Sequence, residues 1–472
     1  MRKQLLSINL LLALSLWVAQ ASPVKGKVSD TTGNPVAGVV VTDGQLFTTT
    51  NHLGEYNLDS DLDKSRFVYL SVPATHEVPT SGGLADQFYQ ELDKSEEINV
   101  HNFTLRKKEQ PQNGFVYLAI SDPQVMNEEH MGRFQAETIT DLKETTARFP
   151  GKEIYGVTLG DLVWDAMELY APYKEAISNL GVTMFSVIGN HDHDLRYTGR
   201  SNQVTPSEGY AEQLFENHFG PYNYSFNVGN VHIVSLKDID YHKDKKYDER
   251  FGPETLEWLR KDVSYVKPGS IVFINVHAPV FNHTDQSRAN AEDAELLKEI
   301  VAPFDTHIFA GHTHFFENSE VTPSLYEHNI GAACGAWWAG NVNRCGAPNG
   351  YLVVEVEGDS VSWHYKATGQ TPDYQFRIYK PGEFKSQPGY LVANLWDWDS
   401  AYQVKWYEDG KEKGPMEAFD DEDQAYIDMM GKGNGYHTLH LFRCQPSPGS
   451  KEIKIEVVNR FGEICDQNEI LP

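Results

Sequence analysis

The chain has few basic residues and few cysteines, and it lacks long apolar segments outside its N-terminus. Lys and Arg number 40 against 67 Asp and Glu, which leaves a formal net charge of −27. A surface this acidic repels the phosphates of nucleic acids and of acidic lipid headgroups, so neither is expected as a bulk partner. An anionic small-molecule substrate remains compatible with this charge, because metal ions can reverse the field inside one pocket.

The first 21 residues have the features of a signal peptide. Basic residues at positions 2 and 3 precede an apolar run over residues 10–18, and the triplet AQA at 19–21 supplies small residues for cleavage. The run is too short to span a membrane comfortably, and no later segment has the length and apolar continuity of a transmembrane helix. We therefore expect an exported protein, periplasmic or secreted, whose mature chain starts at Ser22.

Only four cysteines are present. In an exported chain an even number permits two disulfides, with three possible connectivities. Pairs between sequence neighbours, Cys334 with Cys345 and Cys444 with Cys465, are the simplest arrangement. Buried free thiols are the alternative, and the sequence leaves both open.

At 472 residues the chain is too long for one core and predicts several domains. Residues 22–110 are predicted to form a small β-sandwich. The segment VKGKV at 24–28 alternates in polarity, turn residues follow at 30–35, and VVV at 39–41 resumes a strand. No chemistry is assigned to this unit.

Residues 113–368 alternate between apolar strands and amphipathic helices. This alternation predicts an α/β layered domain, closed by a hairpin over 351–365. The other predicted strands cover 116–121, 154–160, 182–188, 224–236, 271–276 and 307–310, and the predicted helices cover 133–147, 167–179, 253–263 and 291–301.

The helical pattern nearly vanishes over residues 371–472. A second β-sandwich is predicted there, with one helical insert near 423–430. Its predicted strands cover 390–395, 403–407, 438–442 and 451–458.

Five short polar motifs each follow an apolar run, in a fixed order. They offer the carboxylate, amide and imidazole groups that build a two-metal hydrolytic centre. Ligands gather at the carboxyl ends of strands in α/β sheets, and chance assembly of five such motifs is improbable. The motifs are SDPQV with Asp122 and Gln124, GDLVWD with Asp161, GNHDHD with Asn190, His191 and Asp192, NVHAP with His277, and GHTHF with His312 and His314.

This motif order resembles the calcineurin-like metallophosphoesterase family, whose signature runs D-x-H, GD, GNH[DE], H, GHxH. The resemblance covers roughly residues 114–367. Residues 24–41 also resemble the transthyretin-like, carboxypeptidase-regulatory sandwich, through the pattern VxGxVxDxxGxPVxGVxV. The three-part layout is similar to a bacterial subgroup with dedicated N- and C-terminal β domains. It implies a layered α/β/β/α core flanked by an N-terminal transthyretin-like β-sandwich and a C-terminal β-sandwich.

The resemblance also implies a role for each motif residue. One divalent metal ion would be held by Asp122, Gln124, Asp161 and His314. A second ion would be held by Asp161, Asn190, His277 and His312, so that the Asp161 carboxylate bridges both. His191, oriented by Asp192, would act as a general acid while a hydroxide activated by the two ions attacks phosphorus.

Gln124 stands where the family signature has a histidine. An amide oxygen is a harder and weaker ligand than imidazole, which favours Mn²⁺, Mg²⁺ or Fe over Zn²⁺ at that position. Gln124 is also compatible with holding a metal-bound water without touching the ion itself.

Two further groups of residues are candidates for the same pocket. Arg196, Arg200 and Arg344 have the planar geometry that binds phosphate oxygens bidentately, although exposed arginines are more often solvated. The pair Trp337-Trp338 predicts either an aromatic wall of the pocket or a packed surface between domains.

The sequence thus predicts an exported, metal-dependent phosphoesterase that cleaves a phosphomonoester or phosphodiester. Its substrate would be a phosphorylated small molecule, sugar or lipid. The alternative is a non-catalytic cell-surface or periplasmic binding or scaffold protein with a degenerate metal centre, and Gln124 is the only residue that supports it.

Overall fold

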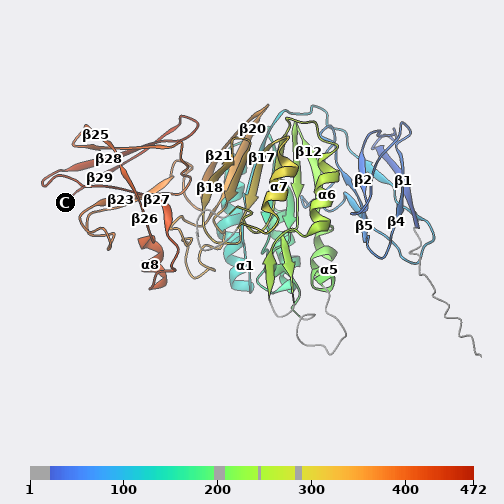
Figure 1. Cartoon of the computed structure of the whole chain (residues 1–472), viewed down its shortest axis with the longest axis horizontal. Coiled ribbons are helices and arrows are strands. Elements are labelled where there is room, and N and C mark those ends of the chain that lie inside the picture. The colour runs from blue at the N-terminus through green and yellow to red at the C-terminus, as the bar shows by residue number, and fades with distance from the viewer. Residues whose placement is uncertain (1–21, 196–207, 243–245, 282–289, 472) are drawn as a thin grey trace, which may run out of the picture.

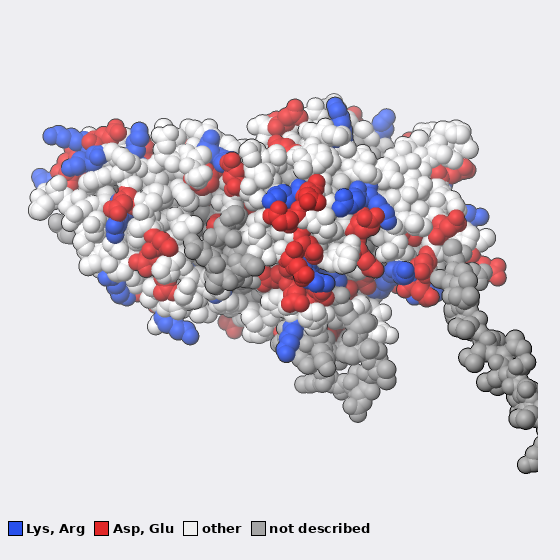
Figure 2. All heavy atoms as spheres, viewed as in Figure 1, with Lys and Arg blue, Asp and Glu red and all other residues white. Residues whose placement is uncertain are grey.

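Three units lie side by side along the long axis of the molecule. The computed structural model describes residues 22–195, 208–242, 246–281 and 290–471. The N-terminal domain lies at one end, the C-terminal domain at the other, and a larger α/β domain lies between them (Figure 1). Acidic side chains gather over the central part of one face, with basic side chains among them (Figure 2).

The N-terminal domain consists of two small β-sheets packed face to face. In β1, Val24 and Val28 are buried while Lys25 and Lys27 are exposed, as the alternation predicts. One sheet has the order β4-β1-β7 with β8 also paired to β1, and the other has the order β3-β2-β5-β6. The strands are β1 (Ser22–Asp30), β2 (Val40–Thr42), β3 (Phe47–Thr49), β4 (Glu55–Ser60), β5 (Phe67–Ser71), β6 (Tyr89–Glu91), β7 (Asn99–Val100) and β8 (Phe103–Leu105).

The central domain stacks a five-stranded sheet, β11-β10-β9-β20-β21, on a six-stranded sheet, β12-β13-β16-β17-β19-β18. Aromatic rings fill the space between the sheets. Tyr117 of β9 lies 5.6 Å from Phe273 and 5.7 Å from Phe309, measured between ring centroids. The strands are β9 (Gly114–Ile120), β10 (Glu153–Leu159), β11 (Thr183–Val187), β12 (Tyr224–Val228), β13 (Val231–Ser235), β16 (Ile271–Asn275), β17 (Asp305–Ala310), β18 (Glu317–Thr322), β19 (Leu325–Asn329), β20 (Gly350–Glu357) and β21 (Ser360–Ala367).

Helices cover the outer faces of both sheets. Val116 and Leu118, which alternate with the inward rings of β9, share a buried cluster with Phe134, Leu142 and Ile177 of the first helices. The second sheet shares its cluster with residues of α6 and α7. The helices are α1 (Glu128–Phe134), α2 (Thr140–Thr146), α3 (Tyr170–Ser178), α5 (Glu208–Phe219), α6 (Pro253–Val263) and α7 (Ala294–Val301).

The helix predicted over 133–147 is longer and less regular than expected. It starts at Glu128, because the Asn127 side chain accepts a hydrogen bond from the His130 backbone at 2.9 Å and caps the first turn. A five-residue π-helical turn, Gln135–Ile139, separates α1 from α2. Helix α5 and the short hairpin of β14 (Ile239–Tyr241) and β15 (Tyr247–Glu249) were not predicted.

The C-terminal domain is a second pair of sheets. Their orders are β22-β23-β27-β26 and β25-β24-β28-β29, and their inner faces share one apolar cluster. The elements are β22 (Phe376–Tyr379), β23 (Leu391–Leu395), β24 (Gln403–Glu408), β25 (Lys411–Pro415), β26 (Glu417–Asp421), α8 (Gln424–Met430), β27 (Thr438–Cys444), β28 (Glu452–Val458) and β29 (Ile464–Ile470). The predicted fold class, a layered α/β/β/α core between two β-sandwich domains, is confirmed.

The disulfides considered from the sequence are not formed, and all four cysteines are free thiols. Cys334 Sγ lies 3.8 Å from Gln124 Oε1 and 3.8 Å from His314 Nδ1, and so faces the polar motifs. The last two cysteines lie on β27 and β29, strands of two different sheets. The structure therefore shows the free-thiol alternative.

The strand ends bring the five motifs to one edge of the central domain. Strands β9, β10 and β11 are parallel, as are β16 and β17, so their carboxyl ends point the same way. Each motif starts within three residues of the end of one of these strands. Within the described residues, no helix is long and apolar enough to cross a membrane.

A buried ion pair ties α2 to the closing hairpin. Lys366 Nζ lies 2.8 Å from both carboxylate oxygens of Asp141, and the Tyr351 hydroxyl donates to the same carboxylate at 2.6 Å. Both charged side chains are at most 5% exposed. Removing one partner of such a pair leaves an uncompensated buried charge.

We expect Asp141→Ala to lower the free energy of unfolding by about 3–5 kcal/mol, because Lys366 is left buried without its counter-ion. Urea unfolding followed by tryptophan fluorescence measures the change. The matched control is the double variant Asp141→Leu/Lys366→Met. It removes both charges, so its free energy of unfolding should fall much less. Equal losses in both variants would contradict the ion-pair explanation.

Candidate metal centre

Backbone strain concentrates around the motifs. Nine described residues other than glycine have positive φ, and eight of them lie in or beside the motifs, with φ between 42° and 67°. Non-glycine residues adopt this region at a cost, and they persist there when surrounding contacts hold them. The eight residues are Asp122, Gln124, Asp161, Asp165, His312, His314, Trp337 and Trp338.

Hydrogen-bond acceptors converge around His277. Its Nδ1 lies 2.7 Å from the Leu159 carbonyl oxygen and donates to it, which turns Nε2 toward the other motif residues. Nε2 lies 3.1 Å from Asn190 Oδ1, 3.1 Å from His312 Nδ1 and 3.3 Å from Asp161 Oδ1. Ligand atoms of Asp161, His277 and His312 all lie within 4.8 Å of one another, as a bound cation requires.

A second set of acceptors faces the same space from the first and last motifs. Asp122 Oδ1 and His314 Nε2 lie 3.7 Å apart, and both are buried without a hydrogen-bond partner among the residues that the structure describes. The other atoms of these groups are engaged, because Asp122 Oδ2 accepts from the His312 backbone at 2.7 Å and His314 Nδ1 donates to Gly335 O at 2.8 Å. Two orphaned acceptors that face each other fit a cation between them.

Gln124 reaches the cluster through its amide nitrogen. Nε2 donates to Asp161 Oδ2 at 2.8 Å, and the backbone N–H of Gln124 donates to the Asp161 carbonyl at 2.9 Å. Its Oε1 lies beside Cys334 Sγ instead of the other ligand atoms. In this orientation Gln124 holds the Asp161 carboxylate through its amide nitrogen, while its amide oxygen is turned toward Cys334.

The electrostatics of the cluster favour a positive charge at its centre. Burial opposes ionisation of Asp161, but His277 and then His191 hold its pKa far below the usual range. Burial also opposes protonation of His277, yet the Asp161 carboxylate outweighs it and raises the pKa of the ring to about 10. Burial lowers the pKa of His314, which therefore stays neutral.

His191 is oriented by Asp165, and the expectation that Asp192 orients it is wrong. His191 Nδ1 lies 3.0 Å from Asp165 Oδ1, and the ring stacks on Trp164 with centroids 4.1 Å apart. Burial lowers the pKa of His191, but Asp161 and Asp165 together raise it above its ordinary value. Both Trp164 and Asp165 belong to the GDLVWD motif, so the sequence did contain the signal.

The Asp192 side chain stabilises the turn that contains it. Its Oδ2 accepts from the Gly189 backbone at 2.9 Å and from the Leu162 backbone at 3.2 Å, and Oδ1 accepts from the Tyr170 hydroxyl at 3.1 Å. Burial raises the pKa of this carboxyl to about 7. Asp192 therefore ties the GNHD turn to the GDL turn, which positions Asn190 and His191 only indirectly.

The mouth of the cluster is a small cavity of about 230 Å³, lined by Asp165, Asn190, His191, Tyr241 and Tyr247. The two tyrosines come from the β14–β15 hairpin, which carried no recognisable motif. The third residue of β15, Glu249, contacts one of the proposed metal ligands, His312. Its Oε1 lies 3.1 Å from His312 Nε2.

The tryptophan pair packs in two directions. Trp338 is buried, and its Nε1 donates to the Pro123 carbonyl at 2.9 Å. Trp337 stacks on His314 at 4.8 Å between centroids and also packs against a cluster that includes Tyr426 of α8. The pair therefore supports the ligand loops and contacts the C-terminal domain.

Of the three arginine candidates, the structure describes only Arg344, which does not line the mouth. Arg344 lies behind the GHTH turn, where its backbone donates to the His314 carbonyl at 2.9 Å and its guanidinium stacks on Tyr436 at 3.7 Å. Arg196 and Arg200 lie outside the described residues.

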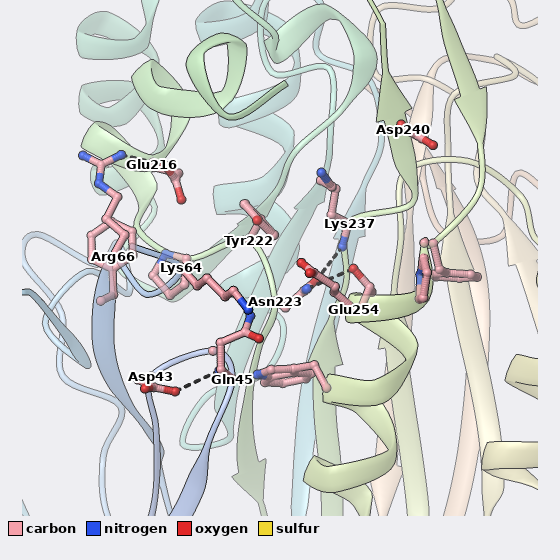
Figure 3. A pocket seen from close by; sticks show the side chains of 18 of the residues that line it. Asp43, Gln45, Lys64, Arg66, Glu216, Tyr222, Asn223, Lys237, Asp240 and Glu254 are labelled. Atoms are coloured by element: carbon pink, nitrogen blue, oxygen red, sulfur yellow. Dashed lines mark hydrogen bonds and ion pairs between the residues drawn. The ribbon is translucent and has the colours of Figure 1, made fainter. Parts of the chain in front are cut away.

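A separate hollow of about 280 Å³ lies between the N-terminal domain and the central domain (Figure 3). Arg66, Lys64, Gln45, Asn223 and Lys237 are among its lining side chains. None of the seven predicted ligands lines it, so it is distinct from the cluster described above.

Comparison with known families covers nearly the whole chain. The family "Calcineurin-like phosphoesterase" matches residues 115–316, "N terminal of Calcineurin-like phosphoesterase" matches residues 22–108, and "C terminal of Calcineurin-like phosphoesterase" matches residues 327–464. No curated protein matches the sequence.

Several solved structures resemble part of the chain. A dimetal phosphatase from Danio rerio is 12% identical, with 54% of this chain and 96% of that chain covered and a TM-score of 0.39. Purple acid phosphatase PPD1 from yellow lupin (Lupinus luteus) seeds is 14% identical, with 56% and 52% covered and a TM-score of 0.39. A 5'-nucleotidase from Candida albicans is 13% identical, with 55% and 52% covered and a TM-score of 0.34.

The family matches agree with the motif order and with the three-domain architecture. Members of this family generally bind divalent metal ions, and the donor set around Asp161 fits such ions. The chain therefore belongs to the calcineurin-like phosphoesterase family and carries the dedicated N- and C-terminal domains of that family.

Proposed function

We propose that this protein is a hydrolase of phosphate esters that depends on two divalent cations. The observation that supports this most directly is the convergence of acceptor atoms around His277, joined by the orphaned pair on Asp122 and His314. One cation would be held by Asp122, Asp161 and His314, and the other by Asp161, Asn190, His277 and His312. When bound, such ions supply positive charge that polarises phosphoryl oxygens and lowers the pKa of water.

Gln124 would keep the shared carboxylate in place. By donating to Asp161 Oδ2 it holds that oxygen toward the first set of ligands, while Asp161 Oδ1 faces His277. The departure from the family's usual histidine is then a change from ligand to positioning residue. Mn²⁺, Fe, Mg²⁺ or Zn²⁺ remain the proposed ions, since the remaining set combines oxygen donors with three imidazoles.

His191 would deliver a proton to the leaving oxygen. Its Nδ1 is engaged by Asp165 and its ring is held against Trp164, so Nε2 is the atom left for the substrate in the cavity that the ring lines. A positioned proton donor of this kind is a general acid. The same ring would also stabilise charge on the phosphoryl group.

The proposed substrates are phosphorylated small molecules, sugars or lipids, as monoesters or diesters. The purified protein, stripped of metal and reloaded with Mn²⁺, should hydrolyse an aryl phosphate monoester or diester and bind two ions by elemental analysis. A panel of phosphorylated sugars, lipid headgroups and nucleotides would then rank the substrates. Absence of turnover with less than one ion bound would favour the non-catalytic scaffold instead.

We also propose that the protein is exported, on the signal-peptide pattern of residues 1–21. When the full-length chain is expressed and the cells are fractionated beside a known periplasmic protein as control, the periplasmic fraction should contain a mature chain that starts at Ser22. Intact mass identifies this chain. A full-length chain that remains in the cytoplasmic fraction would contradict export.

We predict that His191→Ala lowers kcat by about 10²–10⁴-fold, because a general acid of this kind contributes that much to the rate. Metal content should stay unchanged, since the ring is engaged by Asp165 and Trp164. Steady-state kinetics on the aryl ester and elemental analysis check both parts. Loss of an ion from the variant would make His191 a ligand and contradict the assignment.

We predict that Asp165→Asn lowers kcat while metal content is retained, because the asparagine amide can no longer offer the charged acceptor that orients His191. The decisive measurement is the double variant with His191→Ala. If Asp165 acts only through His191, the second substitution adds little to the loss from the first. Fully additive losses would mean that Asp165 acts on the substrate by itself.

A further inference from the structure

A carboxylate from outside the five motifs contacts one of the proposed ligands. Glu249 Oε1 lies 3.1 Å from Nε2 of His312, and the His312 Nδ1 atom on the other side of the ring lies 3.1 Å from His277 Nε2. The imidazole thus spans the distance between the carboxylate and the acceptor cluster. Both side chains are mostly shielded from solvent, with 12% exposed for His312 and 24% for Glu249.

The hairpin that carries Glu249 is anchored at its base. Glu249 pairs with Ile239 across the two strands, and Ile239 is fully buried. The next residue, Arg250, donates its backbone N–H to the Asp238 carbonyl at 2.8 Å. The Asp238 carboxylate in turn accepts the backbone N–H of His277 at 3.0 Å. Asp238 therefore links the strand that carries Glu249 to the loop that carries His277, a second proposed ligand.

The three proposed ligand histidines differ in the group that binds the outer ring nitrogen, which is the nitrogen facing away from the cluster. His277 and His314 each direct the outer ring nitrogen to a backbone carbonyl, at 2.7 Å and 2.8 Å. His312 directs its outer nitrogen to a carboxylate, and the Tyr247 hydroxyl lies farther from the same atom, at 3.5 Å. A carboxylate partner fixes the ring tautomer and makes the inner nitrogen a stronger donor to a metal ion.

We propose that Glu249 is a positioning residue for the second cation site. By accepting the Nε2–H of His312, it holds the ring in the tautomer whose Nδ1 lone pair faces His277 and Asp161. It also adds a negative charge at the periphery of the site. This inference rests on the proposed two-cation function and gives the β14–β15 hairpin a part in metal affinity.

The test measures Mn²⁺ binding to metal-free protein by isothermal titration calorimetry. Glu249→Leu should weaken one of the two binding events by about 10–100-fold, the range typical when such an outer partner is lost. Glu249→Gln should lose less, since its amide oxygen still accepts the Nε2–H. Excess Mn²⁺ should restore much of the kcat of both variants, because the substitution removes affinity for the ion and leaves His191 intact.

The matched control is Asp248→Asn. Asp248 is the neighbouring carboxylate on β15, but its side chain is 66% exposed and lies 2.9 Å from His242, away from the cluster. This variant should bind both ions as the wild type does.

Three outcomes separate the possibilities. A Glu249→Leu variant that folds and binds both ions with wild-type affinity would overturn the proposal, and Glu249→Ala, which also lacks the acceptor, serves this purpose if the Leu variant is unstable. An equal loss of Mn²⁺ affinity in Asp248→Asn would mean that net charge alone causes the effect, and this would also overturn the proposal. A wild-type protein that binds fewer than two ions would instead contradict the two-cation function itself.

Discussion

The carboxylate of Asp161 connects every part of the candidate site. Its Oδ1 accepts the His191 backbone N–H at 2.8 Å and faces His277, while its Oδ2 accepts the Gln124 amide. A buried carboxylate needs such partners, because desolvation of an unpaired charge is costly. The loops after β9, β10, β11 and β16 are therefore held in one arrangement by a single group, and the geometry of both proposed cation sites follows from it.

Tight backbone turns make this convergence possible. Asp122, Asp161 and His312 all have positive φ, which turns each side chain back across the strand end toward the centre. Glycine before Asp161 has no space for a side chain, since a Cβ there would lie 2.4 Å from His277 Nδ1. The strain in these turns is sustained by the packed sheets beneath them.

The C-terminal domain supports the last ligand turn from behind. Asn394 donates to the Cys345 carbonyl at 2.8 Å, Arg377 donates to the Gly346 carbonyl at 2.8 Å, and His440 lies 3.2 Å from the Phe316 carbonyl. These contacts hold the segments that flank His314. The N-terminal domain instead contacts α6, where Trp258 Nε1 donates to Tyr69 at 3.0 Å, and it leaves the proposed cation sites untouched among the described residues.

The repeating apolar runs of the sequence determine the strands and helices, and the motifs that end those runs determine which side chains gather at the strand ends. Periodicity and motif order are local properties, so they can be read without coordinates. The tertiary structure alone decided the partners of those side chains. Asp192 follows His191 directly yet caps its own turn, Cys334 faces Gln124 instead of Cys345, and Glu249 reaches His312 from a hairpin 63 residues away. Such contacts depend on how distant layers pack, and no spacing along the chain encodes that packing.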